Sequence, residues 1–465
     1  MKRPPPNDDH CAGSGDSPAG AGALPASGHR QGAAQRPPVT ISPQDPWLHG
    51  RRAHELLDAW SHRANESIAL SIRSPFCPLH CLFCDRDILA AQSSEAIEDY
   101  VCGLLDEILL LAGRIGNARD IVQLHLGGGT ATEWRASQLT RLVDTLRRAW
   151  RLPAEAEMSV DCDPRRVGWA RLRLLRGLGF DEVRYGVPDL DPTVQLAIGK
   201  LHSAALIEDV CELTRDAGIG CVTLRLMIGL PHQTTARWHA TVSRLIAIAP
   251  DRITLSRYRH RPWQAPAQGT MDADALPDPV ACENLWALAA RLLCEAGYRW
   301  VGVDQFVLDT DPLAHAVDQH RLRRTLIGHT GLAAASVLGL GVGAHSEVDA
   351  HRLVNEDTVA RWRAAIRAGQ LPLARVRTAN LHASRRRAAV EHLLCALELP
   401  HALVAGGLED LYDGLSRWAH TGEVEVRHDR IAVNDRGRHR LLDLCGDYDE
   451  SAWAAAGLSD GGWRR

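Results

Sequence analysis

The stretch Ser71–Asp87 has the sequence SIRSPFCPLHCLFCDRD and places three cysteines close together, with charged residues after them. Cys77, Cys81 and Cys84 follow the spacing C-x3-C-x2-C. A structural zinc site normally has four protein ligands, often two separate cysteine pairs. The chain has no matching second pair, and His80 inside the loop is poorly placed to complete a tetrahedron. Three thiolates therefore favour a [4Fe-4S] cluster in which the fourth iron stays open. The alternative is that these thiols are merely buried side chains.

An open iron predicts a second cofactor that can chelate it. S-adenosylmethionine (SAM) has an amino group and a carboxylate for this purpose, and its reductive cleavage to a 5'-deoxyadenosyl radical is chemistry of the cofactor itself. The segment LHLGGGTATE (124–133) ends the next expected strand with Gly127, Gly128 and Gly129. Consecutive glycines allow a ligand to approach the backbone closely. The alternative is a tight turn from a strand into a helix.

Short apolar runs alternate with helical patterns between residues 66 and 258. We expect strands at 67–72, 121–126, 157–162, 181–187, 221–228 and 251–258. We expect helices at 94–114, 136–149, 165–177, 191–199, 204–216 and 235–248. Repeated strand–helix units predict parallel strands with right-handed crossovers. The fold class is therefore α/β, a partial (β/α)6 barrel whose chemistry lies at the carboxyl ends of the strands, where the cysteines also fall.

The rest of the chain divides into three parts. Residues 1–45 are rich in Pro, Gly, Ala and Ser, which predicts a disordered tail. Residues 46–350 are assigned to the barrel and its extensions, with VLGLGVGAHS (337–346) expected to be a tight turn region. Residues 351–450 are assigned to a small C-terminal module. Three helices, a hairpin at EVEVRHDRIAVND (423–435) and a short helix there predict a winged-helix-like fold.

Charge and composition limit the partners. The 465 residues carry a net charge of -4, which gives no indication of general nucleic-acid binding. No apolar run is long enough for an integral membrane segment, and no secretory signal is apparent. We therefore expect a cytoplasmic protein, with a monomer favoured, whose twelve cysteines are free thiols or metal ligands.

Several motifs along residues 66–445 resemble one known family. They are SPFCPLHCLFC (74–84), LHLGGGTATE (124–133), SVDCDPRRV (159–167), LLRGLGFDEVRYGVPDLDPTVQ (174–195), LMIGLPHQT (226–234), APDRITLSRYRH (249–260), EAGYRWVGVDQF (295–306) and LGLGVGAHS (338–346). Their order resembles the oxygen-independent coproporphyrinogen III oxidases of the radical SAM superfamily. The C-x3-C-x2-C motif is typical of the whole superfamily, whereas the last two motifs and the C-terminal module narrow the resemblance to this branch.

The resemblance implies a reaction and its cofactors. Two propionates of coproporphyrinogen III would each lose a hydrogen atom and carbon dioxide, giving the vinyl groups of protoporphyrinogen IX in haem synthesis. The substrate is then an anionic porphyrinogen, and a low-potential protein donates the electron. The cluster maps to Cys77, Cys81 and Cys84. The implied SAM-binding positions are Gly127, Gly128, Gly129, Thr130, Asp161 (ribose), Lys200 (SAM carboxylate) and Arg225 (adenosyl side). The catalytic side chains are not identified by the resemblance.

The chain departs from the family pattern at six positions. Ser71 replaces an aromatic residue, Arg73 a His, Asp161 a Glu, Pro188 a Gln, Lys200 an Arg and Arg225 an Asp. Arg73, Lys200 and Arg225 would add positive charge at the barrel mouth, which suits a tetracarboxylate substrate. The alternative is that these cations pair with Asp161, Asp163 or Asp189.

A haem carrier, or a radical SAM enzyme for another substrate, is the competing hypothesis. A carrier needs an axial ligand, and the candidates are His125, His260, His329 and His345. A single His is more often a hydrogen-bonded structural residue. Asp304 and Gln305 are expected either to face the substrate or simply to end a strand, and Thr234 is expected to cap a helix.

Overall fold

A computed structural model describes residues 48–441, apart from residues 64–65, 87, 91, 334–335, 350 and 406. The predicted tail, 1–45, and the end of the predicted C-terminal module, 442–450, lie outside the described residues. The centre of the fold is a 13-stranded sheet in the order β1-β17-β16-β15-β14-β2-β5-β6-β7-β8-β9-β11-β10.

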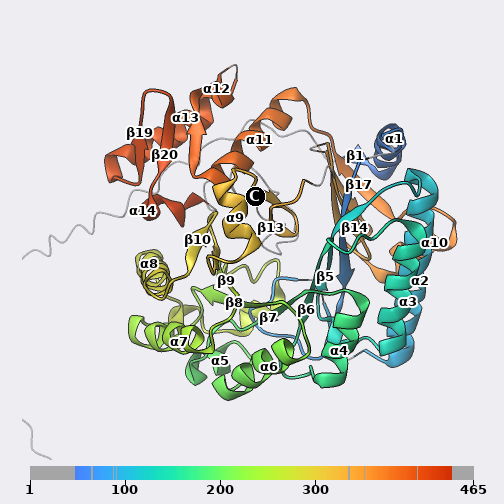
Figure 1. The fold of residues 1–465 in the computed structure, drawn as a ribbon, viewed down its shortest axis with the longest axis horizontal. Helices are drawn as coiled ribbons and strands as arrows, with labels where there is room; N and C mark the ends of the chain where they lie inside the picture. The colour runs from blue at the N-terminus through green and yellow to red at the C-terminus, as the bar shows by residue number, and fades with distance from the viewer. Residues whose placement is uncertain are drawn as a thin grey trace, which may run out of the picture. The chain divides into compact units, whose positions relative to one another are not determined.

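The six predicted strands form neighbouring parallel strands, as expected. They are β2 (Ile68–Ser74), β5 (Ile121–Gly128), β6 (Glu157–Cys162), β7 (Glu182–Gly186), β8 (Cys221–Ile228) and β9 (Arg252–Arg257). The helices that connect or follow them are α2 (Ser94–Ile115), α3 (Ala136–Ala149), α4 (Trp169–Leu178), α5 (Pro192–Ala197), α6 (Ala204–Asp216), α7 (Thr235–Ile248) and α8 (Pro279–Glu295). Figure 1 shows these helices forming an outer layer around the curved row of strands.

A seventh parallel strand corrects one expectation from the sequence. The predicted turn region at 337–346 is a turn only at 341–344. Before it, β14 (Ser336–Leu340) pairs in parallel with β2, and after it β15 (His345–Val348) runs back antiparallel. The glycines of this segment resemble those of a turn, which is why a strand was not expected. Gly339 is instead required within β14, because a Cβ there would overlap the backbone of His345. The strand adds β14 to the parallel row beside the strand that leads into the cysteines.

Both edges of the sheet are antiparallel. On one side lie β16 (His351–Asn355), β17 (Leu373–Arg377) and β1 (Leu48–His49), with α1 (Gly50–Ser61) and α10 (Val359–Arg367) packed nearby. On the other side lie β11 (Gln305–Val307) and β10 (Arg299–Val301). Residues 351–377, which the sequence analysis groups with the C-terminal module, therefore continue the main sheet. Two small sheets and a short helix lie outside the main sheet: β3 (Phe76–Cys77) with β4 (Leu89–Ala90), β12 (Arg323–Thr325) with β13 (Gly328–Thr330), and α9 (Pro312–Asp318).

The C-terminal module has its own core. It contains α11 (Leu381–Ala396), α12 (His401–Val404), α13 (Glu409–Ser416) and α14 (Asp435–Arg438). A small sheet has the order β18 (Glu398–Pro400), β20 (Arg430–Val433), β19 (Val424–Val426), and β19 and β20 form the expected hairpin. Apolar side chains such as Leu393, Leu411 and Ile431 are fully buried within it. The comparison with a winged helix stays a prediction.

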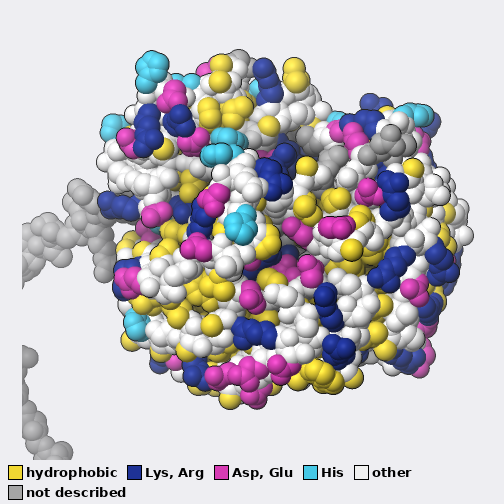
Figure 2. Space-filling model, viewed as in Figure 1, with side chains coloured by type: hydrophobic (Ala, Val, Ile, Leu, Met, Phe, Trp, Pro, Cys, Tyr) yellow, Lys and Arg dark blue, Asp and Glu magenta, His cyan; other side chains and the backbone are white. Residues whose placement is uncertain are grey.

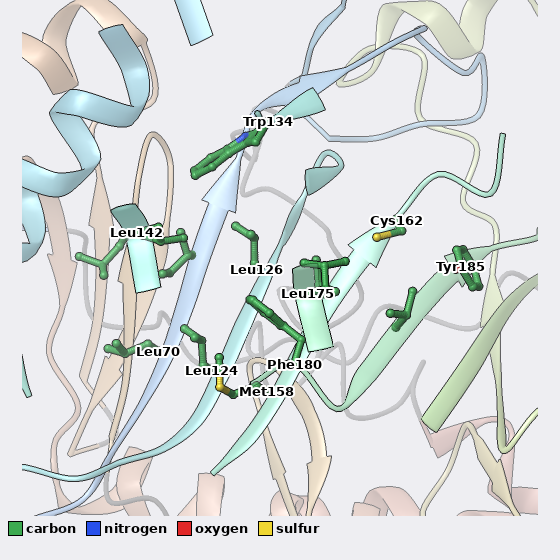
Figure 3. Close-up of a cluster of buried hydrophobic side chains, with 14 of the residues drawn as sticks. Leu70, Leu124, Leu126, Trp134, Leu142, Met158, Cys162, Leu175, Phe180 and Tyr185 are labelled. Atoms are coloured by element: carbon green, nitrogen blue, oxygen red, sulfur yellow. The ribbon is translucent and has the colours of Figure 1, made fainter. Parts of the chain in front are cut away.

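The main core lies between the parallel strands and the outer helices. Figure 3 shows Leu70, Leu124, Leu126 and Met158 from the strands facing Leu142 of α3 and Leu175 of α4. Leu70, Leu124, Leu126, Leu142 and Leu175 are fully buried, and each such side chain stabilises the fold by about 1.5–3 kcal/mol. This packing holds the strands in register, so their carboxyl ends meet along one rim.

Candidate active site

A cavity opens where the parallel strands end. Its wall includes Gly128 of β5, Asp161 of β6, Gly186 of β7, Met227 of β8 and Arg257 of β9, which all lie at or near the carboxyl end of their strand. The cysteine loop after β2 forms another part of the wall. In the view of Figure 2, acidic and basic side chains surround a hollow near the centre of the molecule. The position agrees with the rule that α/β barrels carry their chemistry at this rim.

All three clustered cysteines line the cavity and are half-buried. The loop is held from two sides: Phe76 and Cys77 pair with β4, and the Leu82 amide donates to the Ile198 carbonyl at 3.0 Å. Burial, and then the neighbouring Cys84, raise the pKa of Cys77 to about 12, and burial also raises the pKa of Cys84. Binding to iron would reverse these shifts, because a coordinating thiol is deprotonated. Over the described ranges, no three Cys, His, Asp or Glu side chains form a ready site for one metal ion.

The three glycines pack against the protein itself. Gly128 has φ of +94°, which favours glycine, and a Cβ on Gly129 would overlap the Phe76 carbonyl oxygen. The Gly129 amide donates to Ser74 at 2.5 Å and the Thr130 amide donates to Phe76 at 2.8 Å. The glycines thus let β5 close against the cysteine loop. Gly128, Gly129 and Thr130 line the cavity, whereas Gly127 lies behind it against His125 and Asp161.

The Thr130 hydroxyl has protein partners. It contacts the Thr132 hydroxyl at 2.8 Å and accepts from the Asp163 amide at 3.1 Å. These bonds join the turn after β5 to the end of β6. Thr130 therefore supports the wall of the site through its side chain.

Asp161 is the centre of charge in the wall. Its Oδ2 lies 3.5 Å from Arg86, 3.5 Å from Arg225 and 3.8 Å from His125. Burial raises the pKa of Asp161, but His125, Arg225 and Arg86 outweigh it, so the pKa falls below its ordinary value. Its other oxygen, Oδ1, is buried and has no hydrogen-bond partner within the described structure. That atom can accept a hydroxyl hydrogen from a ligand.

The three expected cations have different environments. The Lys200 ammonium lies beside Gly186 and lines the cavity, with no ion pair to any described carboxylate. Arg225 lines the cavity and pairs with Asp161, as the alternative hypothesis expected. Arg73 lines an adjoining pocket beside the cysteine loop, where it donates to the Gly343 carbonyl at 3.1 Å. Arg73 therefore lies beside the cysteine loop but outside the lining of the main cavity.

The sequence analysis missed Arg86, which comes two residues after Cys84. Its guanidinium donates to the Gly128 carbonyl and pairs with Asp161, so it ties the end of the cysteine loop to β5 and β6. Its position close to the third cysteine is visible in the sequence, but the spacing does not predict which groups it contacts. Arg184 was missed as well: it lines the cavity and makes a bidentate contact with Glu182 at 2.8 and 3.0 Å.

Cations outnumber acids in the described wall of the cavity. Its charged residues are Arg86, Arg165, Arg184, Lys200, Arg225, Arg257 and Arg259 against Asp85, Asp161, Asp163 and Asp304. Asp163 is bound by Arg165 at 2.7 Å, and Asp304 makes a bidentate pair with Arg324 at 2.9 and 3.0 Å. The wall therefore favours an anionic ligand.

The four histidines considered as haem ligands lie outside the lining of this cavity. His125 contacts the Ser159 hydroxyl at 2.9 Å, His260 contacts the Tyr258 hydroxyl at 2.9 Å, and His329 lies 3.5 Å from Asp304. His345 of β15 is half-buried, and burial lowers its pKa to about 3. The contacts of His125, His260 and His329 are those of structural histidines, whereas the buried Nδ1 of His345 has no hydrogen-bond partner within the described structure.

The remaining predicted residues are divided between the site and its supports. Asp304 and Pro188 line the cavity, whereas Gln305 and Ser71 lie on strands outside its lining. Thr234 caps α7 by accepting from the Arg237 amide, as predicted. Asp189 is fully buried and accepts from Thr241 and Gln233 at 2.6 and 2.7 Å, so it pairs with neither Arg225 nor Lys200.

These observations test whether the residues present fit a cluster and SAM. Three thiols reach the cavity from one loop, one buried carboxylate oxygen lacks a donor, and one ammonium lacks a carboxylate. The donor set suits iron–sulfur binding, and the two unmatched groups are complementary to a ribose hydroxyl and an amino-acid carboxylate. The site therefore fits both groups.

A parallel half-barrel with a cysteine triplet at its carboxyl rim is the arrangement of radical SAM proteins, and the Radical SAM superfamily model matches residues 71–245. The "Oxygen-independent coproporphyrinogen III oxidase" of Paracoccus denitrificans is 30% identical, covering 85% of this chain and 89% of the relative. The enzyme of the same name from Pseudomonas aeruginosa is 29% identical, covering 85% and 88%. The chain belongs to the family of oxygen-independent coproporphyrinogen III oxidases.

A solved structure gives the same result for the fold. Coproporphyrinogen III oxidase (HemN) from Escherichia coli, described as a radical SAM enzyme, superimposes with a TM-score of 0.79 at 27% identity. The match covers 84% of this chain and 92% of that one. Among the described helices, none has the length and apolar character needed to cross a bilayer.

Proposed function

We propose that this protein is a radical SAM oxidoreductase that decarboxylates the propionates of coproporphyrinogen III to vinyl groups in haem synthesis. The observation that carries the proposal is a cysteine triplet opening onto a cavity whose wall has more cations than acids. A tetracarboxylate substrate needs such a wall, because guanidinium groups match carboxylates well. The family of the chain supports the same reaction.

The cofactors would be held by residues named above. Cys77, Cys81 and Cys84 would bind a [4Fe-4S] cluster, Lys200 the SAM carboxylate, and Asp161 a ribose hydroxyl through Oδ1. When bound, the two cofactors supply a carbon-centred radical able to abstract a hydrogen atom. Gly128 and Gly129 shape the wall next to the cluster, and Arg86 and Arg225 keep Asp161 ionised. Phe83 and Met227 add apolar surface to the wall, which would limit water around the reacting centre.

The cluster and the free thiols also constrain the partner and the compartment of the protein. A cluster that is reduced before each cleavage needs a low-potential electron donor protein, and free thiols require a reducing compartment such as the cytoplasm. The described cysteines all carry free thiols. The C-terminal module, rather than the barrel alone, would cap the substrate.

The test is anaerobic turnover by the reconstituted protein. Coproporphyrinogen III, SAM and a chemical reductant should give protoporphyrinogen IX together with 5'-deoxyadenosine. Cys77→Ala should abolish both products and reduce the iron content. Cys294→Ala is the matched control, because Cys294 is exposed on α8 away from the cavity lining. SAM cleavage without decarboxylation would point to another substrate, and stoichiometric haem uptake without SAM cleavage would favour a carrier.

A further inference from the structure

Two aromatic side chains in the cavity wall each have a buried ring nitrogen without a partner. Trp286 of α8 and His439, which follows α14 in the C-terminal module, both line the cavity. Their ring centroids are 6.2 Å apart with planes at 30°. Neither Nε1 of Trp286 nor Nε2 of His439 has a hydrogen-bond partner within the described structure. Figure 1 shows α14 next to α8, at the junction of barrel and module.

Trp286 is an exception among the largest buried side chains. Six tryptophans in the described part of the chain are almost completely buried: Trp60, Trp134, Trp150, Trp238, Trp286 and Trp362. Five of these indoles donate to a protein oxygen at 2.9–3.1 Å. Only Trp286, of the six, borders the cavity and lacks an acceptor. A buried donor left unsatisfied is costly, so an acceptor supplied from the cavity would be favoured.

His439 is held in position by its neighbours along the chain. The Arg438 guanidinium lies 4.2 Å from the centroid of the Trp300 ring and donates to the Gly302 and Trp300 carbonyls. Arg440 pairs with Glu423 inside the module and lies 3.9 Å from Glu283 of α8. These contacts fix the segment on the barrel and leave His439 between them, facing Trp286.

The unpartnered ring nitrogens of Trp286 and His439 favour a ligand that accepts hydrogen bonds. Burial lowers the pKa of His439, and the next largest influence is Arg257 at the end of β9, which lowers it further. Both influences favour the neutral imidazole, which donates through Nε2 in the tautomer that carries its hydrogen there. The nearby acids Glu283 and Glu423 are both within reach of Arg440. An indole N–H can only donate, so the complementary ligand is an acceptor, and a carboxylate has two acceptor oxygens.

We propose that Trp286 and His439, with Arg257 beside them, form a subsite for one carboxylate of the substrate. This inference rests on the proposed function, because that function supplies a substrate with several carboxylates. The subsite joins α8 of the barrel to the C-terminal module. The module therefore takes part in substrate recognition as well as covering the cavity.

Binding of coproporphyrin III, the stable oxidised form of the substrate, tests the subsite by fluorescence titration of the cluster-loaded protein with SAM present. Trp286→Phe keeps an aromatic ring but removes the donor, and should weaken binding about tenfold, as expected for one hydrogen bond to a charged group. His439→Phe should act similarly, and His439→Gln should restore most of the affinity, because the amide can donate. SAM affinity should not change.

Two controls separate recognition from stability. Trp238→Phe removes an indole that donates to Leu285 outside the cavity, so it should leave porphyrin affinity unchanged. The tetramethyl ester of coproporphyrin III lacks the charged carboxylates and should bind the wild type and Trp286→Phe equally. Free-acid binding that is unchanged in both Trp286→Phe and His439→Phe, or an equal loss for acid and ester, would overturn the subsite. Failure of the proposed function has a different result: a wild type that neither binds the porphyrin nor forms product.

Discussion

Replacing Glu107 by Gln should remove a pH dependence of stability from the barrel. Glu107 lies on α2 and is only 2% exposed. Its carboxylate accepts from the Gly341 amide at 2.8 Å, Asn355 at 2.7 Å and the Trp362 indole at 3.0 Å. These bonds hold the turn after β14 against α2 and α10, next to the strand that carries the cysteines.

The magnitude follows from the carboxyl's pKa. Burial raises the pKa of Glu107 to about 7 from 4.5, although its three N–H donors oppose the shift. A carboxyl with a raised folded-state pKa stabilises the fold fully below pH 4.5 and loses that contribution as pH rises through about 7. Proton linkage then makes the wild type about 2 kcal/mol less stable at pH 8.0 than at pH 5.5 through this group. Gln cannot titrate, so the variant lacks this loss.

Urea unfolding of the wild type and Glu107→Gln at both pH values measures the effect. The difference in unfolding free energy between them should shift by about 2 kcal/mol, in favour of the variant, as pH rises from 5.5 to 8.0. All other titrating groups are common to both proteins and cancel. A difference that does not change with pH, or that moves in favour of the wild type, would show that the three donors keep Glu107 ionised and that burial does not control its pKa.

Two further predictions concern the site. Gly129→Ala should lower the iron content and the melting temperature, because its Cβ would overlap the Phe76 carbonyl oxygen. The control Gly113→Ala on α2 has open space and should stabilise the fold by up to about 1 kcal/mol. Normal iron content in Gly129→Ala would show that the cysteine loop can move away. Asp161→Asn should weaken SAM binding about tenfold in equilibrium dialysis with unchanged iron content, because it removes the charged acceptor at Oδ1; unchanged SAM affinity would exclude Asp161 as a ligand-binding group.

The elements of the barrel were predictable because their signals are local. The apolar periodicity of α3, α6 and α7 gave bounds of 136–149, 204–216 and 235–248, which agree with the structure. The cysteine triplet was interpretable for the same reason, because its three residues lie in one loop and their spacing alone indicates a cluster site. β14 was missed because its pairing of Ser336 with Ile68 joins residues far apart in the chain, and its glycines resemble those of a turn.

The sequence by itself determined the strand–helix alternation, the cysteine triplet and the family motifs, because each depends on residues near one another in the chain. Only the tertiary structure decided which charges meet. Arg86 and Arg225 converge on Asp161 from separate elements, whereas Arg73 lines an adjoining pocket. The position of His439 against Trp286 was likewise decided by the docking of the module on the barrel. Such contacts depend on the packing of distant segments, which local propensity and spacing do not encode.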